Sequence, residues 1–332
     1  MDFSLTDEQE LLRDTACNLL TKECPPALVR AYVDDPGAAD GLWDRHLRDW
    51  VTLGDGPLVD HCLFLEEAGA VVLPGPYFAT SALFVPLLRA IDHPQADAAC
   101  AGEIVGTVAM AGASGRWQVT DERTRTFVLD AARADHIAVV GPGPSVAVVE
   151  RGRVEPVAMQ SLDLARRIFT LDVPDGLETV ALSEVALHGV IERATVALAA
   201  ESVGASRWLL EHSVAYAKER VQFDKPIGSF QGLQWKLVAM AQDHQRAAAA
   251  VAYAAMAVDA DDPERTRAAH VAKAAAGRAG RHSARDGMQV HGGIGYTWEH
   301  DLHLFLRRAE ANDALLGSAT WHQDRLGELL LG

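Results

Sequence analysis

The chain has 332 residues, of which 49% are hydrophobic and 23% are charged, and its formal net charge is −16. This length and composition are typical of a globular protein with two or three domains, and they exclude a fibrous or a disordered chain. The acidic balance argues against binding to nucleic acid, which requires clustered Lys and Arg. An anionic ligand would need a local basic patch on this acidic background.

The N-terminal segment and the cysteines predict a cytoplasmic protein. The first fifteen residues are acidic and lack the apolar region of a signal peptide, and no run approaches the ~18 apolar residues of a membrane span. No C-x-x-C pair occurs among the four cysteines, so we expect inert thiols in a reducing compartment and no metal site. The cysteines are Cys17, Cys24, Cys62 and Cys100.

The first hundred residues are predicted to be helical. Thr6 and Gln9 form a capping-box signature, followed by apolar residues at helical spacing. Pro25 and Pro26 end this run, and a second helix can begin there because Pro is tolerated in a first turn. Further helices are predicted over residues 40–54, 59–72 and 78–91.

The pattern then changes to short β-rich runs separated by Gly, Pro and Asp, which predict antiparallel strands. Long Ala-rich helical runs follow, with apolar residues on more than one face, and these predict an antiparallel bundle. The expected fold is therefore mainly α with a central β-domain. The predicted domains are an N-terminal helical domain (1–102), a shortened β-domain (103–187) and a C-terminal four-helix bundle (188–332).

Two segments of the predicted bundle carry the chemistry. YAKERVQFDKPIGSFQ (216–231) holds a basic and aromatic cluster, and QVHGGIGYTWEHDLHLFLRRA (289–309) holds a glycine-rich turn. An arginine beside an aromatic side chain, together with a glycine-opened backbone, suits a diphosphate attached to a flat ring.

These two segments closely resemble the acyl-CoA dehydrogenase family, as do FSLTDEQELLRD near the N-terminus and LEEAGAVVLPGPYFAT (65–80). The resemblance covers essentially the whole chain. It implies an acyl-CoA substrate and an FAD that lies between subunits, where the bundle of one protomer completes the flavin site of its neighbour. In most relatives the electron acceptor is an electron-transfer flavoprotein.

The resemblance also implies the cofactor-binding residues. Arg220 would bind the FAD pyrophosphate, Gln222 would bind the same phosphates, and an apolar group would line the adenine pocket. Backbone groups of the second motif would approach the ribityl–adenosine side. The adenine group is Phe223, Ile227 and Phe230, and the second motif contributes Gln289, Gly292 and Gly293. Taken singly, Arg220 is also compatible with a surface ion pair, and the Gly-Gly turn with a helix cap.

The sequence departs from the family at the catalytic base. The family reaction removes the α-proton of an acyl-CoA thioester with a glutamate and passes the β-hydride to flavin. The two positions at which relatives carry this glutamate are Leu316 and Ala194 here. Neither side chain can accept a proton.

Glu201 is a weak candidate for a displaced base, because burial in an apolar run would raise the pKa of its carboxyl. A structural ion pair is the alternative interpretation of Glu201. Glu310 and Asp313 lie near Leu316 in sequence but on other helix faces, and Glu192 is expected to pair with Arg193.

The β-domain departs from the family as well. The Thr-Glu and Gly-Ser-Asp elements that contact flavin and substrate in relatives are missing from the region that begins VAMAGASGRW, and Trp117 is not followed by the usual pattern. The contacts of this chain with its own flavin ring are therefore expected to be depleted.

Together these departures predict a subunit without the catalytic glutamate, which completes the FAD site of a catalytic partner in an α2β2 heteromer. Such paired subunits resemble those of actinobacterial steroid side-chain β-oxidation. The alternatives are a homomeric acyl-CoA dehydrogenase that uses Glu201 as a displaced base, and a flavin-free structural or acyl-CoA-binding paralogue.

Overall fold

The computed structural model describes residues 3–331, and these group into two compact units. The first unit contains the residues up to Pro26, Cys62–Leu73 and the chain from Thr195 onward. The second contains Ala27–His61 and Pro74–Ala194. This division does not test the three domains predicted from sequence, which remain a prediction.

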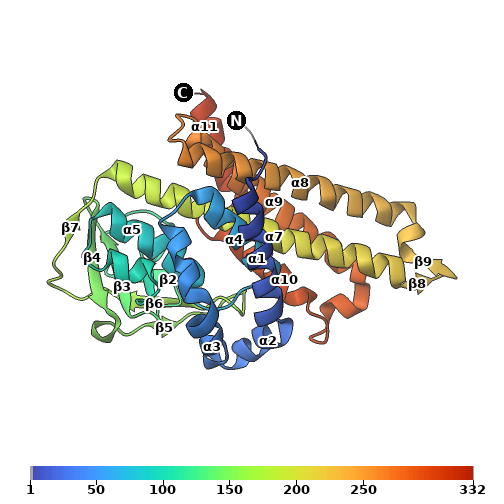
Figure 1. Cartoon of the computed structure of the whole chain (residues 1–332), viewed down its shortest axis with the longest axis horizontal. Helices are drawn as coiled ribbons and strands as arrows, with labels where there is room; N and C mark the ends of the chain where they lie inside the picture. The colour runs from blue at the N-terminus through green and yellow to red at the C-terminus, as the bar shows by residue number, and fades with distance from the viewer. Residues whose placement is uncertain (1–2, 332) are drawn as a thin grey trace. The chain divides into compact units, whose positions relative to one another are not determined.

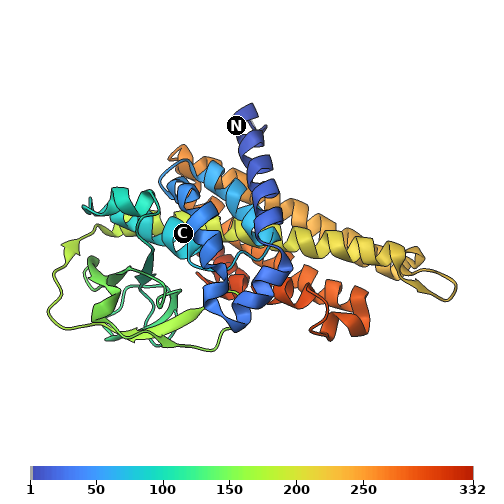
Figure 2. The ribbon, with the colours of Figure 1, turned by 60° about the horizontal axis from the view of Figure 1, so that its bottom comes forward.

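The first unit is a helical bundle with one short hairpin. Helices α8 and α9 pack against each other, and α9 also contacts α10 and α11. The β8–β9 hairpin projects where α7 ends and α8 begins (Figures 1 and 2). The elements of this unit are α1 (Asp7–Glu23), part of α4 (Leu58–Ala70), most of α7 (Glu184–Glu219), β8 (Val221–Gln222), β9 (Lys225–Pro226), η6 (Ile227–Ser229), α8 (Gln231–Asp259), α9 (Arg265–His291), η7 (Gly292–Tyr296), α10 (Leu302–Ala314) and α11 (Ala319–Leu331).

The N-terminal capping box is confirmed. The Thr6 side chain accepts a hydrogen bond from the Gln9 backbone, and the Gln9 side chain accepts one from the Thr6 backbone. The last helical part of the chain consists of two helices, α10 and α11, because residues 315–318 form a turn between them. This turn contains Leu316, whose φ of 58° is incompatible with a continuous α-helix.

Two glycines allow α4 and α7 to cross closely. A Cβ atom on Gly69 would lie 1.9 Å from the Glu201 carbonyl oxygen, and one on Gly204 would lie 1.8 Å from the Glu66 carbonyl oxygen. Only glycine permits backbones to approach this far. Arg207, one turn beyond Gly204, fixes the crossing through ion pairs of 2.8 Å to Glu66 and 2.7 Å to Glu67.

The second unit combines helical segments with two sheets. Its described helical elements are α2 (Pro26–Asp34), η1 (Pro36–Ala39), α3 (Asp40–Leu42), η2 (Trp43–Leu47), η3 (Arg48–Gly54), η4 (Ala79–Phe84), α5 (Val85–Ala90), α6 (Ala96–Cys100) and η5 (Arg151–Arg153), together with the starts of α4 and α7. Residues 40–54 form α, π and 3₁₀ turns in succession, not the single helix expected. Pro86 has no backbone N–H to donate, and the preceding Val85 donates to Thr80 in the wider spacing of a π turn.

The β-rich runs expected between residues 103 and 187 form the six strands β1 to β6, and a further short strand, β7, follows them. One sheet has the order β1-β3-β4-β7 and the other β2-β6-β5. Pairing is antiparallel except between β1 and β3, which are parallel. The strands are β1 (Gly106–Ala109), β2 (Thr124–Leu129), β3 (His136–Gly141), β4 (Ser145–Glu150), β5 (Val157–Ala158), β6 (Ile168–Asp172) and β7 (Val180–Ala181).

None of the helices formed within residues 3–331 has both the length and the apolar character needed to cross a membrane.

Candidate functional site

A hollow of about 580 Å³ lies between the β8–β9 hairpin and the end of α9. Every cofactor-binding residue predicted from sequence lines it, although α8 and most of α9 separate the two motifs in the chain. The lining residues are Tyr216, Arg220, Gln222, Phe223, Ile227, Phe230, Leu233, Gln289, Val290, His291, Gly292, Gly293 and Ile294. We call this hollow the hairpin pocket.

The hairpin is formed by a tight two-residue turn. Phe223 and Asp224 both have positive φ, 53° and 63°, as a type I′ turn requires. A bulky residue rarely adopts this conformation, and such positions are concentrated at functional sites. The turn leaves the Phe223 ring 85% exposed, with its edge toward the Phe230 ring. Two apolar rings are thus presented at the pocket rather than buried in the core.

Basic groups flank these rings. The Lys225 ammonium lies over the Phe230 ring, 4.5 Å from its centroid. Arg220 follows the end of α7, where its backbone carbonyl accepts a hydrogen bond of 2.8 Å from Ile227 and so closes the base of the hairpin. The Arg220 side chain is exposed and lines the pocket. A guanidinium in this place can offer two parallel donors to phosphate oxygens.

The opposite wall is the glycine turn after α9. Gly292 ends the helix with φ 60° and ψ −137°, a conformation that requires glycine, and no atom lies within 4 Å of where its Cβ would be. The backbone is therefore open to the approach of a ligand. His291 is buried, donates from Nδ1 to the Gly287 carbonyl at 2.8 Å, and stacks on Tyr216. Burial lowers the pKa of His291.

The two positions at which relatives carry the base are closed apolar sites. Ala194 is completely buried on α7, and the Leu316 side chain is 4% exposed in the turn between α10 and α11. The described part of the chain therefore places no carboxylate at either position.

Buried polar groups hold the turn around Leu316. Lys273 of α9 donates to the carbonyls of Asp313 and Gly317 at 3.0 and 2.7 Å, and His322 Nε2 donates to the Leu316 carbonyl at 3.0 Å. Burial lowers the pKa of Lys273 to about 7. Burial, with the charges of Lys273 and His270, lowers the pKa of His322 to about 3, so its imidazole is neutral. These contacts give the turn a rigid structure without a base.

Glu201 is held in a buried ion pair. Its carboxylate accepts hydrogen bonds from Arg308 Nη1 at 2.7 Å and from Asn312 Nδ2 at 3.1 Å, and all three side chains are buried. Arg308 also donates to the Leu73 carbonyl at 3.2 Å. A carboxylate fixed by a guanidinium is stabilised in its charged form and is poorly placed to take up a proton. Glu201 therefore has the contacts of a buried structural ion pair.

The other acidic candidates have structural partners as well. Asp313 accepts from the Ala319 backbone at 2.9 Å and lies 3.4 Å from Arg281. Glu192 lies 3.9 Å from His188, and Arg193 donates to the Gly56 carbonyl at 2.8 Å. Burial raises the pKa of Glu310, which lines a different hollow with arginines of α9.

Sequence reasoning missed Lys273 and His322. Lys273 is a lone basic residue in the run AKAAAG of α9, and its position on the helix face that also carries Ala269, Ala276 and Gly280 was the available signal. His322 carried no signal, because its role depends on the approach of Leu316 from the preceding turn.

The profile of the acyl-CoA dehydrogenase C-terminal domain matches residues 184–331. Acyl-CoA dehydrogenase IpdE2 of Mycobacterium tuberculosis is 35% identical over 324 residues, which cover 94% of this chain and 94% of that protein. The chain belongs to the acyl-CoA dehydrogenase family. The resemblance expected from sequence is thereby confirmed, and with it the assignment to the oxidoreductases.

Other relatives agree with this placement. Acyl-CoA dehydrogenase FadE34 of M. tuberculosis is 36% identical over 97% of this chain, which spans 48% of the length of that protein. Among solved structures, a chain of the ChsE4–ChsE5 complex from M. tuberculosis superposes with a TM-score of 0.87 and 25% identity, over 100% of this chain and 99% of that chain. A steroid acyl-CoA dehydrogenase variant, Tcur3481–Tcur3483, gives a TM-score of 0.86 and 25% identity, over 98% of each chain. These superpositions confirm the fold class expected from sequence.

Proposed function

We propose that this acyl-CoA dehydrogenase is the subunit without the catalytic glutamate, and that it completes the FAD site in an α2β2 heteromer with a catalytic partner. One observation carries the proposal. The hairpin pocket keeps every predicted cofactor-binding residue, whereas Leu316 and Ala194 close both positions for the base. A homomeric enzyme would need both the cofactor-binding residues and the catalytic base in one sequence.

The hairpin pocket fits the adenosine diphosphate part of FAD. Arg220 would hold the pyrophosphate through its guanidinium, with Gln222 beside it, and Phe223, Ile227 and Phe230 would pack against the adenine. The backbone at Gly292 and Gly293 is open for close approach. When bound, FAD supplies the acceptor for the β-hydride of the acyl-CoA. The role of this chain is to bind and orient the cofactor, and the partner supplies the base.

Three considerations support the partner and the substrate class. Glu201 is bound by Arg308 and Asn312 and is therefore poorly suited to proton abstraction. Positions 194 and 316 carry no carboxylate. The ChsE4–ChsE5 structure is of a complex of two differently named chains. The Tcur3481–Tcur3483 structure is described as a steroid acyl-CoA dehydrogenase, so we propose a steroid or other bulky acyl-CoA as substrate and an electron-transfer flavoprotein as acceptor.

Purification of the chain alone and with the acyl-CoA dehydrogenase subunit encoded beside it tests this proposal. We expect the chain to be colourless alone, and the complex to show flavin absorbance and acyl-CoA-dependent dye reduction. A yellow, active chain on its own would instead support Glu201 as a displaced base. Absence of flavin in both samples would support the binding paralogue.

Arg220→Ala in the complex tests the pocket itself. We expect flavin retention to fall at least tenfold, because a charge-assisted contact to phosphate contributes roughly 1.5–3 kcal/mol. Lys218→Ala, also exposed near the end of α7, is the matched control and should leave flavin content unchanged. Unchanged retention in the Arg220 variant would contradict the pyrophosphate assignment.

A further inference from the structure

Helix α9 is strongly basic in an acidic protein. It carries six Lys or Arg residues and one acidic residue, Asp286, whereas the whole chain has a net charge of −16. Three of the arginines, at positions i, i+3 and i+7, follow one face of the helix over about 10 Å. These are Arg278, Arg281 and Arg285, which we call the arginine row.

Buried carboxylates fix the arginine row in place. In each case the contact is made by Nε: Arg278 to Asp243 at 3.5 Å, Arg281 to Asp313 at 3.4 Å and Arg285 to Asp286 at 3.4 Å. Each of these carboxylates is less than 10% exposed, whereas the arginine side chains are 63%, 43% and 74% exposed. Contact through Nε leaves the terminal Nη groups of the row available for an external anion.

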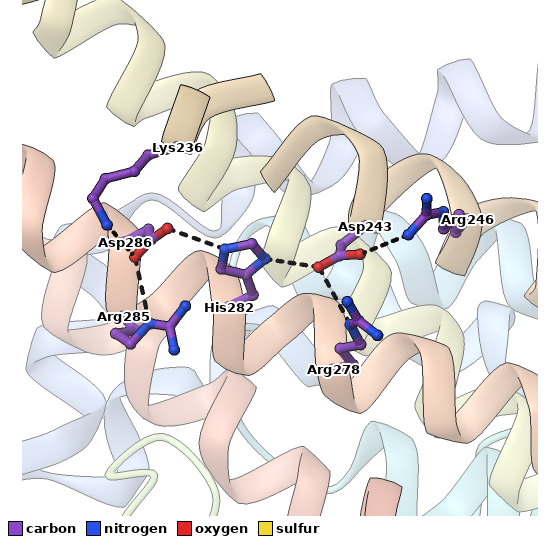
Figure 3. A network of polar contacts seen from close by, with 7 residues as sticks. All are labelled: Lys236, Asp243, Arg246, Arg278, His282, Arg285 and Asp286. Carbon is purple, nitrogen blue, oxygen red and sulfur yellow. Dashed lines mark hydrogen bonds and ion pairs between the residues drawn. The ribbon is translucent and has the colours of Figure 1, made fainter. Parts of the chain in front are cut away.

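The contacts beneath the row form one network. His282 lies between Asp243 and Asp286, at 2.7 and 3.0 Å, and Lys236 of α8 pairs with Asp286 at 3.1 Å (Figure 3). Arg246 of α8 lies 3.4 Å from Asp243 (Figure 3). The network joins α8 to α9 and pairs Asp243 and Asp286 with basic side chains, of which Arg246, Arg278 and Arg285 are mostly exposed.

Two adjoining hollows, which we call the α8–α9 groove, accompany the row. A hollow of about 560 Å³ is lined by the arginine row with Asp243, His282 and Glu310. A second hollow of about 230 Å³ shares Asp243 and Arg278 with it and has an apolar floor. That floor consists of Val271, Ala274, Ala275 and Leu326. The groove thus offers an apolar end followed by a basic end along α9.

The N-terminal segment of this same chain has the complementary pattern. Asp7, Glu10 and Asp14 are exposed on α1 with the 3-and-4 spacing of the arginine row, and Phe3 before them is 55% exposed. Alignment of Asp7 with Arg278 puts Glu10 opposite Arg281 and Asp14 opposite Arg285. The three residues between Phe3 and Asp7 are long enough to carry the Phe3 ring to the apolar floor.

We propose that the α8–α9 groove binds the segment Phe3–Asp14 of a second copy of this chain. The three carboxylates pair with the arginine row, and Phe3 enters the apolar hollow. A two-fold symmetric pair would use the contact twice, which is the commonest arrangement of homo-oligomers. The proposal requires neither flavin nor a catalytic partner, so it stands or falls independently of the proposed function.

A double-mutant cycle on the self-association of the full-length chain tests the contact. One triple variant is Arg278→Gln, Arg281→Gln and Arg285→Gln, in which the amides can still donate to the buried carboxylates. The other is Asp7→Asn, Glu10→Gln and Asp14→Asn. Sedimentation equilibrium at low salt should show each triple variant weakening association about tenfold, as three surface ion pairs would, and their combination weakening it little further. High salt should weaken the wild type in the same way.

The control removes three positive charges elsewhere through Arg151→Gln, Arg153→Gln and Lys218→Gln, and it should associate like the wild type. A photoreactive phenylalanine analogue at position 3 should cross-link to the α9 or α11 part of the groove in a dimer band. The proposal is overturned if the wild type remains a monomer, if the two triple variants have independent effects, or if the cross-link falls elsewhere. Circular dichroism of each variant establishes that it is folded.

Discussion

Arg308 is among the largest side chains that the fold buries completely, and its charge is compensated by Glu201 at 2.7 Å. Such a pair gains little over an apolar substitute, but the loss of one partner leaves a buried charge without compensation. Glu201 therefore belongs to the framework of the bundle, where it ties α7 to α10. Its position three residues before Gly204 also places it at the close crossing with α4.

Glu201→Gln should destabilise the chain because it leaves the Arg308 charge buried without a counter-charge. We expect a loss of about 3 kcal/mol or more in the free energy of unfolding, measured by urea denaturation. Glu211→Gln on the exposed face of the same helix should change this free energy by less than about 0.5 kcal/mol. If Glu201→Gln kept full stability and abolished turnover, the residue would be the displaced base instead.

The sequence predicted the functional residues that belong to a family motif. It missed the buried residues that lie outside the motifs. Arg220 and Gly292 were predicted and now line one pocket. Lys273 was missed because nothing in an alanine-rich helix indicates which carbonyls will lie opposite it. The partner of Glu201 also could not be predicted, since Arg308 lies 107 residues away in the chain.

Among the elements, the α10–α11 turn is ordered although it carries leucine at the position of the catalytic glutamate. Lys273 and His322 together bind the carbonyls of Asp313, Leu316 and Gly317. Gly317, with φ 99°, allows the chain to enter α11. The turn remains ordered because backbone acceptors are satisfied, and none of these contacts uses the side chain at position 316.

The stability of this turn should depend on pH through Lys273. Its pKa is about 7 in the folded chain and near its ordinary value of 10.5 when unfolded. Between these values the unfolded state binds more protons, so the free energy of unfolding rises with pH. Relative to Lys273→Met, the wild type should gain up to about 1.4 kcal/mol per pH unit between pH 7 and 10.

Urea denaturation of both proteins at pH 7, 8 and 9 measures this difference, and Lys218→Met is the exposed control. Parallel pH dependence of wild type and Lys273→Met would show that the Lys273 ammonium is not destabilised by burial.

The sequence predicted helices and strands correctly where capping residues, hydrophobic periodicity and turn residues agree. The capping box, the six β-rich runs and the long helices of the bundle are confirmed. Local signals failed over residues 40–54, where Trp43, Leu47 and Val51 are buried while the backbone changes between helix types. Side-chain burial there decides the backbone path, and helical periodicity alone cannot distinguish α, π and 3₁₀ turns.

At the scale of the whole molecule, three exposed aromatic residues lie on the hairpin turn and just after the glycine turn, and we call them the aromatic rim. They are Phe223, which is 85% exposed, Tyr296 (77%) and Trp298 (59%). Exposed apolar surface is typical of a site of interaction. It is the surface that the proposed partner and its flavin would cover.

Hydroxyl-radical footprinting of the chain alone and in the complex tests this coverage. Tyr296 and Trp298 should become several-fold less reactive in the complex, because a subunit interface excludes solvent. Trp321, which is 44% exposed on α11, provides the internal comparison for a residue outside the rim. Equal reactivity of the rim residues in both samples would place the partner elsewhere.

The sequence by itself determined the family, the order of helical and β segments, and the absence of a carboxylate at the two expected positions, because each depends on residue types at fixed spacing. Only the tertiary structure decided the partner of Glu201, since its ion pair joins helices that are distant in sequence. It also decided that Arg220 and Gly292 line one hollow and that the Leu316 turn is held by Lys273. These contacts depend on how the bundle helices pack, which no local pattern of residues specifies.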